Sequence, residues 1–465
     1  MRTPLASVDA SWLRMDEPNN PMVVNGVLVL DGPVSAQRVR TLLQVRLLCF
    51  DRFRQRVVRP LAGMGVPSWE DDPEFSLDHH LVVERLPAPG DEAALQALIS
   101  ALASEPLPPR RPPWRIHLVP NYQGGSALIV RVHHCVADGL ALVHVLLSLA
   151  DRPPENVPSE PAARRSRWET LRALVAGTVR VLPERPDHLA ALIRLLLLTP
   201  EPVTRFKGPL TRGKKLVWSR AYRLEDFKRV GRATGSTVND VLMAALAGGL
   251  RRYLLTHGTV RRTLDVRGVV PVNLRRASEA PTLGNRFGLV FLSLPLGIRS
   301  PGARLAEVRR RMRALKKSPG AAAIFELLWV MGRLPRPLFD AVIDLFAAKA
   351  TAVVTNVVGP REPLSILGAR LRQAMFWVPC AGHLGLGVSL LSYAGQVWVG
   401  VHSDVGLVPD PERIVDAFEE ELDALQLASS ARRSKRPEAR LDPAARRRPT
   451  AAARTSPTAA QVTTP

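Results

Sequence analysis

Short apolar runs, separated by polar and Pro-rich stretches, predict alternating strands and helices in the first part of the chain. Strand-like runs of Val, Leu and Ile occupy residues 23–30, 116–120 and 127–134. Apolar positions with helical spacing occupy residues 34–50, 91–104 and 140–149. Because strands and helices are interleaved along the chain, we expect a mixed α/β unit here.

The second half of the chain is richer in strands. An apolar helix is predicted over residues 238–254, and Thr237 and Asp240 have the spacing of a capping box at its start. Strand-like runs follow at residues 266–272, 288–294, 352–357, 374–378, 384–390 and 396–402. Both halves are therefore expected to combine sheet and helix.

A segment rich in Pro and charge, residues 151–165, predicts a break between two domains, since Pro fixes the backbone φ angle and removes a hydrogen-bond donor. We expect four regions: an N-terminal domain at 1–150, a linker with crossing helices at 151–215, a C-terminal domain at 216–428 and a basic disordered tail at 429–465. The helical stretches at 168–198 carry Arg172, Arg180 and Arg194. This pattern is compatible with packing against their own domain or with binding to an anionic membrane surface.

The composition is that of a globular protein. Of the 465 residues, 46% are hydrophobic and 23% are charged, which excludes disorder throughout and suggests about two or three packed units. The formal net charge of +22 favours an anionic partner, such as nucleic acid, an acidic membrane surface or a phosphorylated cofactor. Nucleic acid is the least favoured, because the basic tail contains no aromatic residue for base stacking.

The cysteines and the start of the chain indicate a cytoplasmic protein. Cys49, Cys135 and Cys380 are far apart and form no CxxC pair, as expected in a reducing compartment. Charged residues interrupt the N-terminus before an apolar run develops, so no secretory signal is expected. The most apolar stretches, 189–198 and 321–334, contain charges and are shorter than the ~20 residues of a membrane span.

The stretch HHCVADG at residues 133–139 is the most informative for chemistry. It places His133 and His134 at the end of a predicted strand, and Asp138 and Gly139 at the entry to the next helix. A neutral imidazole can take a proton from a hydroxyl near neutral pH and return it to a leaving group, as acyl transfer to an alcohol requires. Asp138 is placed to cap the helix or to bind a buried Arg, and Gly139 leaves the approach to the helix open.

Other interpretations of these residues are open. Two histidines at a strand end can simply satisfy local hydrogen bonds. A metal site is disfavoured, because adjacent strand residues point to opposite faces and no HExxH motif or Cys partner accompanies them. On the same geometry, Cys135 is expected to be a buried thiol rather than a nucleophile.

The string HHCVADG also matches the HHxxxDG motif of the superfamily of condensation domains and coenzyme A-dependent acyltransferases. The chain resembles one branch of it, the bacterial wax ester synthase/acyl-CoA:diacylglycerol acyltransferases, over nearly its whole ordered length. The further matching segments are PLASVDASW (4–12), NPM (20–22), WEDDPEF (69–75), LPAPG (86–90), PW (113–114), GPL (208–210), VNDV (238–241), PVNLR (271–275), GNRF (284–287) and TNVVGP (355–360).

The resemblance implies an α/β fold of two chloramphenicol-acetyltransferase-like domains, each a mixed sheet with helices, which face each other across a central tunnel. It implies that His134 is the general base that deprotonates the hydroxyl of diacylglycerol or of a long-chain alcohol, which then attacks an acyl-CoA thioester. His133, Asp138 and Gly139 are expected to support the motif. Arg275 is the expected partner of Asp138.

The remaining matches each have two interpretations. Trp114 corresponds to an acyl-tunnel motif or to a core aromatic residue. Asn239, Asp240, Gly284 and Asn285 are expected either at the substrate tunnel or in capping and domain packing. Acyl-CoA is the expected co-substrate, with no permanently bound cofactor or metal. The expected location is cytoplasmic, peripherally on the inner face of the plasma membrane or on lipid droplets, and the oligomeric state is not predicted.

Departures from the family pattern flank the expected acyl path and bear on acyl length and acceptor preference. Pro112-Pro113-Trp114 stands where Pro-Leu-Trp is usual, Leu107-Pro108 stands where Leu-Asp is usual, and Lys207 replaces an Asn before Gly-Pro. Two other functions stay open. One is a condensation-type enzyme with a carrier-protein thioester and an amine acceptor, although no carrier module is visible. The other is an inactive lipid-binding homologue.

Overall fold

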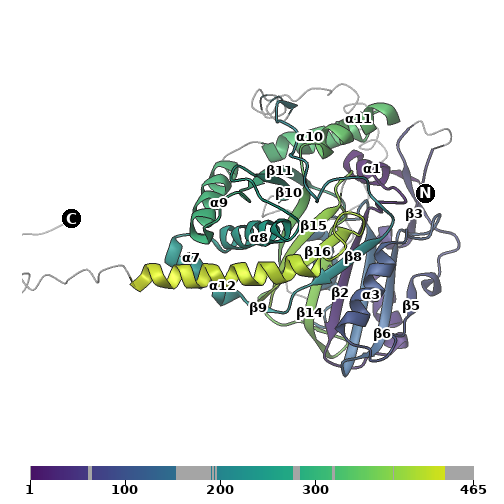
Figure 1. The fold of residues 1–465 in the computed structure, drawn as a ribbon. Coiled ribbons are helices and arrows are strands. Elements are labelled where there is room, and N and C mark those ends of the chain that lie inside the picture. The colour runs from purple at the N-terminus through teal and green to yellow at the C-terminus, as the bar shows by residue number, and fades with distance from the viewer. Residues whose placement is uncertain are drawn as a thin grey trace, which may run out of the picture.

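Two mixed β-sheets form the centre of the molecule (Figure 1). The computed structural model describes residues 2–60, 65–152, 190, 193, 196–275, 283–316, 320–380 and 382–434. The first sheet has the order β13 (Ser365–Ile366), β14 (Ala369–Trp377), β2 (Val23–Leu30), β7 (Gly125–His133), β6 (Trp114–Tyr122) and β5 (Leu81–Val83). The second has the order β11 (Phe287–Leu294), β10 (Val266–Asn273), β12 (Ala352–Val358), β15 (Leu386–Tyr393), β16 (Gln396–Asp404) and β8 (Lys214–Trp218), and β9 (Tyr222–Arg223) also pairs with β16. A small third sheet contains β1 (Thr3–Pro4), β4 (Ser68–Asp71) and β3 (Gln55–Val58).

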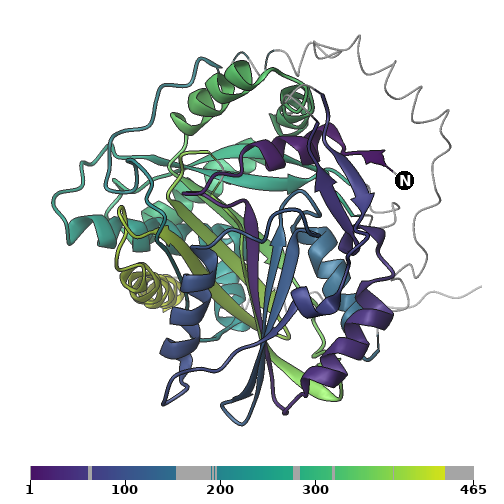
Figure 2. The same cartoon turned by 90° about the vertical axis from the view of Figure 1, so that its right-hand side faces the viewer.

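Two strands of the second half, β13 and β14, belong to the sheet of the first half. β14 pairs antiparallel with β2, where Phe376 stands opposite Gly26 and Trp377 opposite Asn25. In Figure 2 the purple strand β2 lies between the blue strands of the first half and the green β14. Two strand pairs of the second sheet, β10 with β12 and β12 with β15, are parallel. The two halves are thus joined through the sheet itself.

Helices cover both sheets. The helices are α1 (Ser7–Arg14), α2 (Ala36–Leu42), α3 (Glu92–Ala103), α4 (Gly139–Leu149), α7 (Leu224–Thr234), α8 (Val238–Leu255), α9 (Pro301–Lys316), α10 (Gly320–Met331), α11 (Arg336–Ala347) and α12 (Glu412–Ser434). Within the described residues there are also a π-helical turn at Leu43–Leu47 and 3₁₀ turns at Asp51–Phe53 and Leu77–His79. α7, α8, α9 and α12 gather beside the second sheet, and α10 and α11 lie at the top of the view, where α10 packs on α1 (Figure 1).

Local signals explain where the main helices begin. The Thr237 hydroxyl accepts a hydrogen bond from the backbone N–H of Asp240, and the Asp240 carboxylate accepts one from the N–H of Thr237. This is the predicted capping box, and it starts α8. The carboxylates of Asp91 and Asp138 cap α3 and α4 in the same way, each accepting a backbone N–H three residues on.

The structure confirms the predicted α/β class and the two mixed sheets. The predicted strand 127–134 ends one residue earlier, at His133, because the chain turns at His134. The domain boundaries stay a prediction. The stretch 168–198 falls almost entirely outside the described residues, whereas α12 continues past residue 428 to Ser434. No helix in the described part of the chain has the length and apolar composition needed to cross a bilayer.

Candidate active site

His134 is fixed by its backbone at the point where the two halves meet. Its N–H donates to the carbonyl oxygen of Met22, next to β2, at 2.8 Å. Its own carbonyl oxygen accepts a hydrogen bond from the Asn285 side-chain amide, at 2.7 Å. Met22 belongs to the first half of the chain and Asn285 to the second. The position of His134 therefore depends on the contact between both halves.

The imidazole ring of His134 is enclosed by aromatic side chains. The Trp12 ring stacks on it with a centroid distance of 4.2 Å and an interplanar angle of 13°, and the Phe287 ring lies 5.8 Å away. His134 is 5% exposed, and its Nδ1 atom makes no hydrogen bond within the described structure. Burial lowers the pKa of His134 to about 4. The ring is therefore neutral near pH 7, which is the form that can accept a proton.

His133 has a different environment and holds the turn. Its Nδ1 accepts the backbone N–H of Cys135 at 3.1 Å, so the ring proton lies on Nε2, which is 3.5 Å from the Asp16 carboxylate. The same Asp16 oxygen accepts the N–H of Met22 at 2.8 Å. Nδ1 of His133 is thus hydrogen-bonded to the turn, whereas Nε2 is near Asp16 but makes no hydrogen bond within the described structure. Cys135 is fully buried, as predicted.

Asp138 performs both functions considered for it. One carboxylate oxygen caps α4 by accepting the N–H of Ala141 at 2.9 Å. The other accepts from the Arg275 guanidinium at 2.5 Å and from the backbone N–H of Arg286 at 3.0 Å. Arg275 also donates to the carbonyl oxygen of Gly284 at 2.9 Å. The expected contact between Asp138 and Arg275 is therefore present, and it binds the start of α4 to the second half.

Gly284 and Asn285 lie beside the histidine motif. Gly284 has a φ angle of +108°, which favours glycine, and forms a bridge with Ala137. Asn285 donates its backbone N–H and its side-chain amide to the carboxylate of Asp9, at 3.0 and 2.9 Å. The second Asp9 oxygen accepts from Arg52 at 3.0 Å. Burial raises the pKa of Asp9, and the neighbouring Arg52 opposes that rise.

Asp9, Trp12 and Arg52 are site residues that the sequence analysis did not assign. Asp9 and Trp12 both lie in α1, within the matching segment at residues 4–12, and that match was the signal available for them. Nothing in the local pattern around Arg52 indicated that it would reach α1. We conclude that α1, a helix of the first half, supports the motif together with Asn285 of the second half.

Asn239 and Asp240 belong to a different part of the fold. Asp240 forms the capping box of α8. The side-chain oxygen of Asn239 accepts a hydrogen bond from the amide of Asn356 on β12, at 3.1 Å. Of the two interpretations left open, these contacts support capping and packing.

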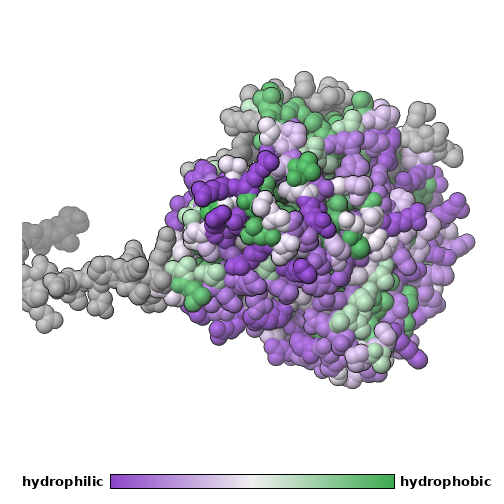
Figure 3. All heavy atoms as spheres, viewed as in Figure 1, coloured by the Kyte–Doolittle hydropathy of each residue, from purple (hydrophilic) through white to green (hydrophobic). Residues whose placement is uncertain are grey.

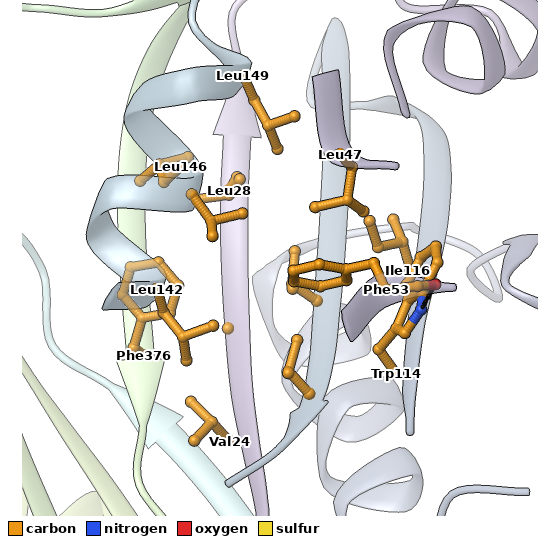
Figure 4. A pocket seen from close by; sticks show the side chains of 14 residues that line it. Val24, Leu28, Leu47, Phe53, Trp114, Ile116, Leu142, Leu146, Leu149 and Phe376 are labelled. Carbon is orange, nitrogen blue, oxygen red and sulfur yellow. Dashed lines mark hydrogen bonds between the residues drawn. The ribbon is translucent and has the colours of Figure 1, made fainter. Parts of the chain in front are cut away.

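Two apolar cavities adjoin the motif. The larger, with an atom-free volume of about 540 Å³, lies between α4 and the first sheet (Figure 4). Trp114 forms part of its wall, and its indole N–H donates to the carbonyl oxygen of Phe53 at 2.8 Å. The smaller, of about 380 Å³, reaches from Gly139 to β12 and β15.

The two cavities meet at shared side chains. Val24, Leu142 and Phe376 line both of them. Figure 4 shows Leu142 and Leu149 of α4 at the two ends of the row of side chains that faces the larger cavity. The two cavities are therefore neighbours along α4, whose first residue, Gly139, lies five residues after His134. Among the described residues, no group of three or more His, Cys, Asp or Glu side chains is arranged to hold a metal ion.

Comparisons with known proteins agree with this arrangement. Residues 5–242 match the wax ester synthase/diacylglycerol acyltransferase catalytic domain, and residues 283–426 match the WS/DGAT C-terminal domain. The chain is 29% identical over 454 residues to a probable diacylglycerol O-acyltransferase of Mycobacterium tuberculosis (strain ATCC 25618 / H37Rv), covering 93% of this chain and 97% of the relative.

Solved structures with the same fold include an enzyme and a condensation domain. The wax ester synthase/diacylglycerol acyltransferase from Marinobacter aquaeolei VT8 has a TM-score of 0.68 at 24% identity, covering 92% of this chain and all of the other. The first condensation domain of the calcium-dependent antibiotic synthetase has a TM-score of 0.63 at 19% identity, with 92% and 96% covered. The domain matches span most of the chain, and the chain belongs to the wax ester synthase/diacylglycerol acyltransferase family of enzymes.

Proposed function

We propose that the protein transfers a long-chain acyl group from acyl-CoA to the hydroxyl of diacylglycerol, of a long-chain alcohol, or of both, with His134 as general base. The observation that carries this proposal is the neutral, buried imidazole of His134, five residues before the helix α4 along which the two apolar cavities lie. The relatives named diacylglycerol O-acyltransferases support the choice of acceptor.

The reaction needs one proton to move twice. His134 takes the proton of the acceptor hydroxyl as its oxygen attacks the thioester carbonyl carbon. The tetrahedral intermediate then collapses, the carbon–sulfur bond breaks, and the imidazolium returns the proton to the leaving thiolate. The products are an ester and coenzyme A, and His134 is neutral again. Stacking on Trp12 and the hydrogen bond from Asn285 hold the base in place through both steps.

The larger cavity fits the acyl chain. Its side chains are apolar apart from the Trp114 indole N–H, which is already bonded to Phe53. A fatty acyl chain is favoured in such an environment because its burial removes apolar surface from water. This supports the tunnel interpretation for Trp114. His133, Asp138, Gly139 and Arg275 are proposed to shape the entrance.

Peripheral membrane association is the second part of the proposal. Apolar side chains gather at the top of the molecule, over α10 and α11 (Figure 3). Leu338 on α11 is 57% exposed, and Val203 in a neighbouring segment is 96% exposed. Hydrogen bonds from Lys349 to Leu196 and from Glu201 to Ala348 hold that segment against the end of α11. Exposed apolar groups on a chain of net charge +22 fit an anionic lipid surface.

The test of the reaction is coenzyme A release from palmitoyl-CoA, with diacylglycerol and hexadecanol offered separately and the esters identified by mass spectrometry. We expect acceptor-dependent ester formation that falls roughly 100- to 10,000-fold in His134→Ala. His383→Ala, at an exposed histidine paired with Asp344, is the matched control and should retain activity. An equally active His134→Ala protein contradicts the assignment of the base. Absence of ester from the folded wild type would favour a carrier-dependent enzyme or a lipid-binding protein.

The test of membrane association is co-sedimentation with phosphatidylglycerol vesicles. We expect the wild type to bind and the Leu338→Glu/Val203→Glu variant to bind more weakly, because both substitutions place charge on exposed apolar positions. Equal binding of the two proteins would contradict the proposal that this surface binds lipid.

A further inference from the structure

The smaller cavity has two hydroxyl groups in an otherwise apolar lining. They belong to Thr355 on β12 and Ser389 on β15. The two residues are register partners on adjacent parallel strands, so their side chains stand next to each other on the same face of the sheet. Both face the cavity whose opposite wall begins at Gly139, the first residue of α4.

Neither hydroxyl makes a hydrogen bond within the described part of the chain. Thr355 is 5% exposed and Ser389 is 3% exposed, and no side-chain hydrogen bond joins either of them to another described residue. A hydroxyl on a cavity wall without a protein partner usually bonds to water or to a ligand. Two of them side by side, at the wall of a cavity next to the motif, form a pair of donors for a ligand oxygen.

Asn356, the neighbour of Thr355, is excluded from this pair. Adjacent strand residues point to opposite faces, and the Asn356 amide donates to Asn239 at 3.1 Å on the side of α8. The amide is therefore already bonded on the far side of the sheet from the cavity.

The N-terminus of α4 adds positive potential to the same space. Gly139 lies at that end of the helix, and the charge of the capping Asp138 is paired with Arg275. A Cβ atom built on Gly139 would meet only the Val357 side chain, at 4.0 Å. Glycine thus leaves the space between the helix end and the two hydroxyls open to a ligand.

We propose that Thr355 and Ser389 donate hydrogen bonds to the thioester carbonyl oxygen of acyl-CoA and stabilise it when it becomes an oxyanion. This inference rests on the proposed function. The acceptor oxygen forms a bond to the carbonyl carbon while the carbonyl π electrons move to the oxygen that the hydroxyls bind. The same electrons re-form the double bond as the carbon–sulfur bond breaks. A carbonyl held here has the apolar side chains shared by both cavities, Val24, Leu142 and Phe376, beside it for its acyl chain.

The experiment compares kcat and KM of the wild type with Thr355→Val, Ser389→Ala and the double variant, using palmitoyl-CoA and the best acceptor. Loss of an oxyanion donor lowers kcat by about 100- to 1,000-fold with little change in KM, because the donor acts mainly in the transition state. Thr355→Ser keeps the hydroxyl and should keep most of kcat. Ser392→Ala is the matched control, since Ser392 lies on β15 outside the cavity lining.

The outcomes separate this inference from the function on which it rests. An active wild type with an equally active double variant overturns the inference alone. A raised KM at unchanged kcat also overturns it, because the hydroxyls would then bind the ground state and the transition state equally. A wild type that forms no ester overturns the proposed function and this inference together. The near-isosteric Thr355→Val variant keeps the test decisive if the double variant does not fold.

Discussion

The Trp12 ring lies almost parallel to the imidazole of His134, at 13° and with 4.2 Å between the ring centroids. Trp12 belongs to α1, and the same helix carries Asp9, which accepts two hydrogen bonds from Asn285. Asn285 in turn donates to the carbonyl oxygen of His134. One short helix therefore contacts the ring of His134 directly and its backbone through Asn285.

Removal of the Trp12 ring should impair both activity and stability. Trp12→Ala leaves a cavity that costs about 3–5 kcal/mol of unfolding free energy, and it frees the imidazole to rotate away from its working position. Trp12→Phe keeps an aromatic face and should retain most of kcat. The measurements are kcat by coenzyme A release and the free energy of unfolding. Trp329→Ala, at a tryptophan that Arg333 covers, is the control and should leave kcat unchanged.

Asp9 should matter for stability because its carboxylate is fully buried and its charged partner is the partly exposed Arg52. Asp9→Asn leaves the partly exposed guanidinium without its counter-charge and should lower the free energy of unfolding by about 1–3 kcal/mol. The Asp9→Asn/Arg52→Met variant removes both charges and should recover part of that loss in a chemical denaturation experiment. Asp31→Asn, at an exposed carboxylate, should have no effect. The pair makes no net contribution if the double variant loses as much unfolding free energy as the two single variants together, or more.

Local features were predictable from the sequence because they depend on neighbouring residues. The strand at 23–30 and the capping box of α8 occur as the apolar pattern and the Thr237–Asp240 spacing predict. Contacts between distant segments could not be predicted in this way. Asp9 and Asn285 are 276 positions apart, and no periodicity marks β14 as the neighbour of β2. The resemblance indicated His134 as the base, whereas the stack on Trp12 required coordinates.

The pH dependence of activity should reflect the buried state of His134. Burial lowers the pKa of the ring from 6.5 to about 4, so the neutral form is present from about pH 8 down to about pH 5. We expect kcat/KM to be level over that range and to fall only as the pH approaches about 4. An exposed histidine would instead lose activity around pH 6.5. A decline centred near pH 6.5, measured with the protein still folded, would contradict the buried neutral base.

Stability should fall over the same acidic range. His80 and His402, like His134, have pKa values lowered by burial to about 4, against 6.5 when exposed. Between these two values the unfolded chain binds more protons than the folded one, so the free energy of unfolding decreases as the pH falls from 6.5 towards 4. Thermal unfolding at pH values across this interval measures the effect. His402→Asn should make the free energy of unfolding depend less on pH. An unchanged slope of this free energy against pH would exclude His402 as a contributor.

Phe376 should control the passage between the two cavities, because it lines both and its ring covers Gly26. Phe376→Leu and Phe376→Ala widen the junction and should raise the relative kcat/KM for longer or branched acyl chains by several-fold to about tenfold. Gly26→Ala acts in the opposite direction, since its Cβ would lie 2.6 Å from the Phe376 ring and push it into the passage. Competition among lauroyl-, palmitoyl- and stearoyl-CoA, read by mass spectrometry, compares the variants. Identical product profiles in folded Phe376→Leu and Gly26→Ala proteins would place the acyl chain elsewhere.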